Sequence, residues 1–236
     1  MRKSVVAAVL LIASNASAGL VVTRERGVRI HIEGNAFRID RPAPSDGPIL
    51  CDSVVSRDGD RNAVCLNSQL HTWFESPYPD MIGSRRLGLA IRAKVRKPPK
   101  IEASDETSDE VIAGHATDRH VIRVSYQLVE GDVRQTIGAT ILVWTARDLP
   151  PAPMKSGVLT NFPEVDEPLA AVFDSFKGMV LKESLSATDT YEGGKPFTET
   201  VSWTTTSIET KSIPATAFEV PKNYRHEQPQ IGVPGK

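Results

Sequence analysis

The sequence has little that would mark it as an enzyme. It contains no Gly-x-Ser-x-Gly, no Ser-x-x-Lys, no His-Glu-x-x-His and no glycine-rich phosphate loop, so the common hydrolase, zinc-protease and nucleotide-binding motifs are absent. The five histidines are scattered along the chain. His115 and His120 lie an odd number of positions apart, so on one strand they would point to opposite faces and would not share a metal. The sequence therefore favours a non-catalytic protein without a metal or cofactor.

A strong net charge and a long apolar run after residue 18 are also missing. The 28 basic and 29 acidic residues leave a formal charge of −1, which gives no general attraction to nucleic acid or to an anionic membrane. A membrane-spanning helix needs about 20 consecutive apolar residues, and no later segment reaches that length. We therefore expect no nucleic-acid partner and no membrane span, while the oligomeric state leaves no signature.

The first eighteen residues have the pattern of a bacterial signal peptide. Arg2 and Lys3 provide a positive start, residues 4–13 are apolar, and residues 16–18 (Ala-Ser-Ala) place small side chains before Gly19. The sequence predicts export, cleavage after Ala18, and a periplasmic or secreted protein. It divides into a signal peptide (1–18), a single β-rich domain (19–225) and a flexible tail (226–236).

Cysteine is scarce, because only Cys51 and Cys65 are present. In an oxidising compartment such a pair indicates a disulfide. A hairpin closed by a three-residue turn at residues 57–59 would place the two cysteines directly opposite each other, within reach of a bridge after a small adjustment. A two-residue turn at Asp58-Gly59 would instead leave them diagonal. We expect the bridge.

Alternation of apolar and polar residues predicts antiparallel hairpins along the chain. Residues 87–95 have the pattern of a strand with a basic outer face, and residues 97–109 have the composition of an exposed loop. A last hairpin is expected from residues 180–187 and 197–208. Two further hairpins have a definite register, with the expected pairs Ile32–Phe37 and Ile30–Ile39 around Gly34-Asn35, and Tyr126–Ile137, Val124–Ala139 and Ile122–Ile141 around Gly131-Asp132.

Residues 166–176 form the one convincing helix. Asp166 is suited to cap it, Pro168 falls in its first turn, and Gly178 follows its end. Its apolar residues recur at helical spacing on one stripe, which consists of Leu169, Val172, Phe173 and Phe176. A helix of about ten residues is too short to stand alone, so we expect that stripe to pack on a sheet.

Four short strings resemble a known family. In order they are residues 112–115 (IAGH), 143–150 (VWTARDLP), 177–182 (KGMVLK) and 218–224 (FEVPKNY). Together they resemble a family of uncharacterised bacterial periplasmic proteins that is related in fold to the outer-membrane lipoprotein carriers of the LolA/LolB type. The resemblance implies a curved antiparallel half-barrel with a helix over its concave side. By analogy of fold it also implies a lipid or lipoprotein as the partner.

The sequence thus predicts a mainly β protein, a curved antiparallel half-barrel with one short helix packed on it. Its function is predicted to be the non-catalytic binding of an apolar or lipid-like ligand, or of a lipidated partner, in the cell envelope. An envelope scaffold with a self-filled core is the alternative, and an exported hydrolase is a remote one. The residues expected to line the ligand cavity are Trp73, Ile91, Ile122, Val124, Tyr126, Ile141, Val143, Phe173, Phe176 and Trp203.

Overall fold

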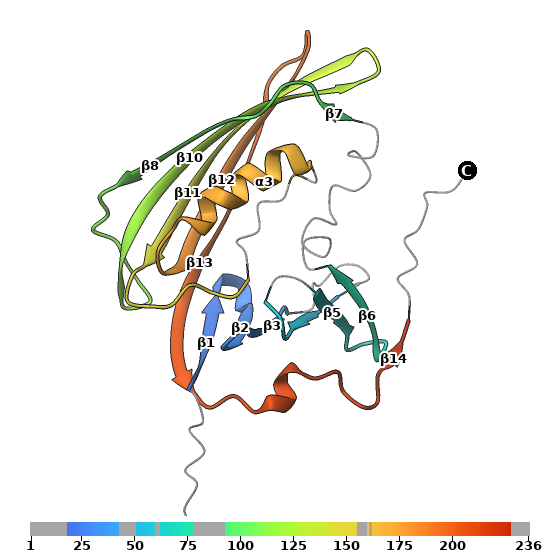
Figure 1. Ribbon diagram of the computed structural model, residues 1–236, viewed down its shortest axis with the longest axis vertical. Coiled ribbons are helices and arrows are strands. Elements are labelled where there is room, and N and C mark those ends of the chain that lie inside the picture. Colours follow the sequence, from blue (N-terminus) through green and yellow to red (C-terminus); the bar gives the residue numbers. More distant parts are fainter. Residues whose placement is uncertain are drawn as a thin grey trace, which may run out of the picture.

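The protein is mainly β-sheet. The computed structural model describes residues 18–42, 51–59, 62–77, 93–154, 160 and 162–227. Within these residues the strands form one mostly antiparallel 14-stranded sheet, accompanied by one α-helix and two short 3-10 turns. The sheet is neither closed nor strongly curled, and its long strands carry the helix on one side (Figure 1).

The sheet has a short-strand region and a long-strand region, which share β13. The short-strand region consists of β1 (Gly19–Arg24), β2 (Arg29–Glu33), β3 (Ala36–Asp40), β4 (Ser53–Ser56), β5 (Asn62–Asn67), β6 (Thr72–Pro77) and β14 (Arg225–His226). The long-strand region consists of β7 (Lys94–Val95), β8 (Lys100–Glu106), β9 (Val111–Ile112), β10 (His115–Glu130), β11 (Val133–Ala146), β12 (Met179–Tyr191) and β13 (Phe197–Lys211). The helix is α3 (Pro163–Asp174), and the 3-10 turns are η1 (Glu25–Gly27) and η2 (Ala215–Phe218).

Two hairpins have the register that their sequences predict. In the β2–β3 hairpin, Ile32 pairs with Phe37 and Ile30 with Ile39. In the β10–β11 hairpin, Tyr126 pairs with Ile137, Val124 with Ala139 and Ile122 with Ile141. Strands β12 and β13 form the expected last hairpin. In the β2–β3 and β10–β11 hairpins a short turn fixes the pairing, and alternation places the apolar residues on one face.

Both faces of the short-strand region are covered. On one face Val22, Ile30 and Phe37 pack into a core with residues from the ends of β11 and β12. On the other face Val55 and Leu66 pack against residues 213–224, which run beneath the short strands (Figure 1). Burial on two faces is the reason that all four residues of β4 are buried.

The register predicted for the second hairpin is wrong, although the disulfide itself is confirmed. Strands β4 and β5 pair Val54, rather than Cys51, with Cys65. The connection from Ser56 to Asn62 is longer than three residues, and the Gly59 N–H donates to the Asn35 carbonyl of the neighbouring turn at 2.9 Å. Cys51 lies just before β4, its Cα is 5.3 Å from that of Cys65, and the two sulfur atoms are bonded.

The exposed loop predicted at residues 97–109 is also wrong over much of its length. Residues 100–106 form β8, which pairs with β10 along seven positions from Arg119 to Ser125. The side chains of β8 are mostly polar and exposed, so its sequence lacks the alternation that identifies a strand. Its backbone nevertheless completes the hydrogen bonding of β10, which side-chain pattern alone does not report.

Three smaller differences concern segment ends. The helix begins at Pro163 rather than at Asp166, because Asp166 accepts hydrogen bonds from the Thr160 backbone N–H and hydroxyl instead of capping the helix. His226, assigned to a flexible tail, pairs in β14 with Trp73 of β6. Of the strand predicted at 87–95, residues 93–95 are described, and β7 occupies the last two; Ile91 lies outside the described residues.

Candidate functional site

The candidate site is the face of the long-strand region on which α3 packs, which we call the inner face. Directly paired residues in an antiparallel sheet share a face, so the register defines which side chains occupy it. One row across the strands runs Ile122, Ile141, Leu185 and Val201. Toward the hairpin tips the next row is Val124, Ala139, Ala187 and Glu199, and the row after it is Tyr126, Ile137, Asp189 and Phe197. The inner face therefore extends over four long strands.

The helix covers the β10–β11 half of this face. Val165 and Leu169 of α3 are buried against Ile122 and Ile141, which have no exposed surface. The helix runs along the strands, with Phe162 near Tyr126 at its start, where the ring centroids are 6.2 Å apart. This half of the inner face is therefore a filled hydrophobic core.

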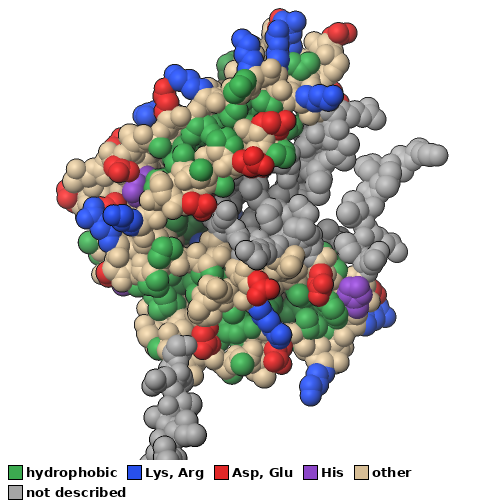
Figure 2. Space-filling model, in the orientation of Figure 1, with side chains coloured by type: hydrophobic (Ala, Val, Ile, Leu, Met, Phe, Trp, Pro, Cys, Tyr) green, Lys and Arg blue, Asp and Glu red, His purple; other side chains and the backbone are tan. Residues whose placement is uncertain are grey.

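The β12–β13 half of the same face is uncovered. Phe197 is 65% exposed, Val201 is 55% exposed and Tyr191 is 46% exposed. Leu185, between the two halves, is partly buried against the core beneath the helix. We call Leu185, Tyr191, Phe197 and Val201 the apolar strip. Figure 2 shows apolar side chains gathered on the long-strand region in the view that it presents.

A charged and aromatic cluster borders the apolar strip on the side of the short-strand region. Trp203 continues the inner face of β13 beyond Val201 and is paired with Glu183 of β12, which is buried. The Arg24 guanidinium lies 3.5 Å from the centroid of the Trp203 ring. A cation over an indole face is held by the ring's negative electrostatic potential, so Arg24 fixes a positive charge at this end of the strip.

Seven of the ten residues expected to line a cavity are brought together beneath or beside α3. Five of them are buried in one cluster, and Phe173 and Phe176 pack on its edge; the five are Ile122, Val124, Tyr126, Ile141 and Val143. Trp73 lies elsewhere, in the core of the short-strand region, and Trp203 lies at the border just described. The five buried residues are therefore part of the hydrophobic core, and other residues form the exposed part of the inner face.

The sequence did not identify the apolar strip. Phe197, Val201 and Trp203 alternate along β13, but Glu199 interrupts their row and polar residues fill the opposite face. Cross-strand pairing places Phe197 and Val201 beside residues of β12. The alternation in residues 197–203 was the available signal, although it does not reveal which half of the sheet the helix leaves bare.

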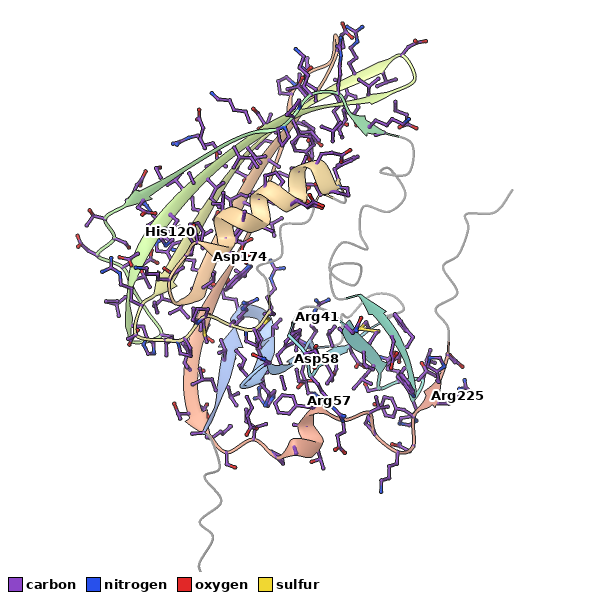
Figure 3. The ribbon with its side chains drawn as sticks, in the orientation of Figure 1. Arg41, Arg57, Asp58, His120, Asp174 and Arg225 are labelled. Carbon is purple, nitrogen blue, oxygen red and sulfur yellow. A yellow bond between two sulfur atoms is a disulfide. The ribbon has the colours of Figure 1, made fainter. Side chains whose placement is uncertain are left out.

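His120 links three elements at the C-terminal end of α3. Its Nδ1 lies 2.6 Å from an Asp105 carboxylate oxygen on β8, and its Nε2 lies 3.0 Å from the Thr145 hydroxyl on β11. The Phe176 ring stacks on the imidazole, with the centroids 4.0 Å apart. Figure 3 shows His120 near the helix end at which Asp174 lies.

The order Asp105, His120, Thr145 resembles the order of groups in a hydrolytic triad, but Thr145 is not placed to act as a nucleophile. Its side chain has no exposed surface, so a substrate cannot approach the hydroxyl. Asp105, in contrast, is largely exposed. The arrangement is that of a buried histidine whose two ring nitrogens are both hydrogen-bonded, and it fixes β8 to the sheet.

A cavity lies on the opposite face of the same sheet. It is an open cavity of about 800 Å³ near the hairpin tips, and it is lined by charges of both signs, including Lys94, Arg96, Arg134, Asp132 and Glu192. An Arg134 guanidinium nitrogen lies 3.8 Å from a Glu192 carboxylate oxygen. Neighbouring opposite charges partly satisfy each other there, so this cavity offers no single preferred ligand charge.

Metal and membrane features are absent from the part of the chain that the structure describes. No group of three or more His, Cys, Asp and Glu side chains within it could hold a metal ion. No helix among these same residues is long and apolar enough to cross a membrane. Comparison of the chain with family models, curated proteins and solved structures finds no match.

Proposed function

We propose that this protein binds the apolar chain of a lipid, or of a lipidated partner, along the apolar strip of its inner face. The observation that carries the proposal is the division of one continuous sheet face into a half filled by α3 and a half left open. Leu185 and Val201 are directly paired on this face, and adjoining apolar side chains that solvent can reach often mark a binding site. An acyl chain laid beside α3 would bury Phe197, Val201 and Leu185 together.

The proposal includes a LolA-like half-barrel and an exported, non-catalytic role. The half-barrel is supported by an antiparallel sheet that carries a helix on its inner face. A location in the periplasm or outside the cell is supported by the Cys51–Cys65 disulfide, because such bonds persist in oxidising compartments. The absence of catalysis is supported by the full burial of Thr145 beside His120.

A fluorescent fatty-acid probe, displaced by palmitate, tests the binding proposal. We expect saturable probe binding that Phe197→Asp weakens about tenfold or more, because a charge is placed where an apolar chain would lie. Thr198→Asp is the matched control, since its side chain points to the opposite face at the same strand end. Equal probe binding by the two variants would contradict the proposal, and no probe binding at all would favour the self-filled scaffold.

Turnover assays test the non-catalytic part of the proposal. We expect the purified protein to show no turnover above buffer on ester, peptide and phosphoester substrates. Activity that disappears in His120→Ala, with an unchanged circular dichroism spectrum, would instead identify His120 as a catalytic base.

A further inference from the structure

Part of β13 has an edge that no described strand occupies. Strand β1 pairs with β13 from Lys211 to Thr205 and ends there at Arg24. Residues 197–202 lie beyond that end, pair with β12 on their other side, and are all exposed. We call them the open edge. An unpaired strand edge presents a row of backbone donors and acceptors that a further strand can satisfy.

The open edge differs in charge from the other outer edge of the long-strand region, which is β8. Charged side chains on an edge strand discourage the addition of a further strand. Those of β8 are Lys100, Glu102, Asp105 and Glu106. The open edge contains one charged residue, Glu199, and neither lysine nor proline. It therefore lacks most of the side chains with which proteins block strand addition.

Glu199 lies in the middle of the open edge without a counter-ion. It points to the inner face together with Phe197 and Val201, because alternate residues of a strand share a face. It pairs with Ala187 of β12, and it forms no ion pair or side-chain hydrogen bond within the part of the chain that the structure describes. The open edge therefore presents an exposed row of an apolar, an acidic and an apolar side chain.

This row defines the side chains that an added strand needs. Directly opposed residues of neighbouring strands have Cβ atoms about 4.5–5.5 Å apart, so opposite charges there attract and like charges repel. A basic residue suits the position opposite Glu199, and apolar residues opposite Phe197 and Val201 would cover their exposed surface. The resulting pattern, a basic residue between two apolar residues at alternate positions, is the same in both chain directions.

The end of β1 limits the length of the added strand. Thr205 is already paired with Arg24, and η1, which follows β1, contacts β13. Trp203 and Thr204, the two residues before Thr205, are partly buried. An added strand therefore fits opposite residues 197–202, a stretch of about 20 Å at about 3.3 Å per residue. A short extended segment of a partner protein meets that limit.

We propose that the open edge binds an extended segment of a partner protein by strand addition, and that Glu199 selects a segment with a basic residue between two apolar ones at alternate positions. Backbone hydrogen bonds supply the affinity in this mode of recognition, and the side chains on alternate positions supply the selectivity. The proposal depends on the strand edge and on Glu199, so it stands whether or not a lipid binds to the apolar strip.

A charge swap with synthetic peptides tests the selectivity. The probes are the fluorescein-labelled peptide Thr-Val-Thr-Lys-Thr-Val-Thr and the same peptide with Glu at its centre, and fluorescence anisotropy without lipid measures their dissociation constants. We expect the wild-type protein to bind the Lys peptide about tenfold more tightly than the Glu peptide, and Glu199→Lys to reverse this preference. Glu192→Lys, the same change at the exposed β12–β13 turn, is the matched control and should retain the wild-type preference.

Backbone methylation of the Lys peptide tests whether it binds as a strand. In an added strand the N–H groups of alternate residues face the neighbouring strand. Methylation of one alternate set of peptide nitrogens should therefore abolish binding, whereas methylation of the other set should not. Hydrogen exchange should slow in residues 197–202 and stay unchanged in β8. The proposal would be overturned by no saturable binding of the Lys peptide up to about 1 mM, by an unchanged preference in Glu199→Lys, or by equal effects of the two methylation patterns.

Discussion

Two stretches of the same sheet have similar residue types but opposite exposure to solvent. All four residues of β4 are buried, whereas residues 197–202 of β13 are all exposed. Both consist largely of β-branched, small and apolar residues, which suit a strand. β4 lies between two packed clusters, while among the described residues this part of β13 pairs with one strand, β12, and Phe197 and Val201 on its inner face are exposed.

The difference comes from what packs on each strand rather than from the strand itself. In the short-strand region, residues 213–224 return beneath the strands and supply Ile213 and Phe218 to the second core. In the long-strand region one twelve-residue helix is the described cover, and its buried residues Val165 and Leu169 reach β10 and β11. The short-strand region is therefore packed on both faces, whereas Phe197 and Val201 in the long-strand region are exposed.

The largest expected effect compares the same substitution in the two regions. Phe37 of β3 has no exposed surface, so Phe37→Ala should reduce the free energy of unfolding by about 3–5 kcal/mol through lost burial and a cavity. Phe197→Ala, on the exposed part of β13, should change it by less than about 0.5 kcal/mol. Urea unfolding followed by circular dichroism measures both. Similar losses in the two variants would show that β13 is covered.

Removal of the disulfide should have the next largest effect, and it acts on the short-strand region. Replacing both Cys51 and Cys65 with Ala opens a covalent loop with a sequence separation of 14, and such a loop contributes about 3 kcal/mol by restricting the unfolded chain. The variant should therefore unfold at lower urea than the oxidised protein. Addition of a reductant should lower the urea midpoint of the wild-type protein to that of the variant. Alkylation of both thiols in periplasmically expressed protein would contradict the bridge.

His120→Ala should have a smaller effect, confined to the covered half of the long-strand region. It removes the contacts to Asp105, Thr145 and Phe176 and should reduce the free energy of unfolding by about 1–3 kcal/mol, because a buried hydroxyl loses its partner. Hydrogen exchange should accelerate in β8 and at the end of α3. His115→Ala is the control, since its partner Asp148 is largely exposed; equal effects would show that His120 holds nothing in place.

The sequence predicted the hairpins whose turns are short and whose apolar residues alternate. Gly34-Asn35 and Gly131-Asp132 leave one register each, and pairing by the wrong position would turn every apolar side chain to the other face. The register predicted for the second hairpin was wrong because the Gly59 backbone N–H is hydrogen-bonded to the Asn35 carbonyl, which lies outside that hairpin. β8 escaped prediction because its mostly polar side chains do not alternate, although its backbone pairs with β10 along seven positions.

The sequence predicted the helix and strands that form the candidate site, but it did not predict which of their side chains are exposed. The helix stripe and the inner rows of β10 and β11 follow from periodicity, and they do meet. Which strands the helix covers depends on where its loops place it, and local sequence does not encode that position. The residues chosen as cavity lining, such as Ile122 and Ile141, are therefore the covered ones, whereas Phe197 and Val201 became apparent only from the pairing of β12 with β13.

The smallest expected effect concerns pH and His31, on β2 of the short-strand region. The ring is half-buried beside Asp40, Arg38 and Lys211. Burial is the main cause that lowers the pKa of His31, the Asp40 carboxylate works in the opposite direction, and the nearby cations Arg38, Lys211 and Arg29 lower it further. The folded protein therefore binds this proton less readily than the unfolded chain does.

The sign of the pH dependence follows from that difference. Above the ordinary histidine pKa, His31 is neutral in both the folded and the unfolded state, so it does not change the free energy of unfolding. As the pH falls through that value, the unfolded chain takes up the proton first, and the folded protein becomes less stable relative to it. The full cost is reached below the folded-state pKa of His31. The Gln side chain of His31→Gln does not take up a proton in this range. The free energy of unfolding of the variant, relative to that of the wild type, should therefore increase as the pH falls from about 7.5 to about 5. Urea titrations at each pH measure this change, and an NMR titration of the His31 ring checks its origin. A midpoint at or above the ordinary histidine value would show that the covering of the short-strand region does not reach His31.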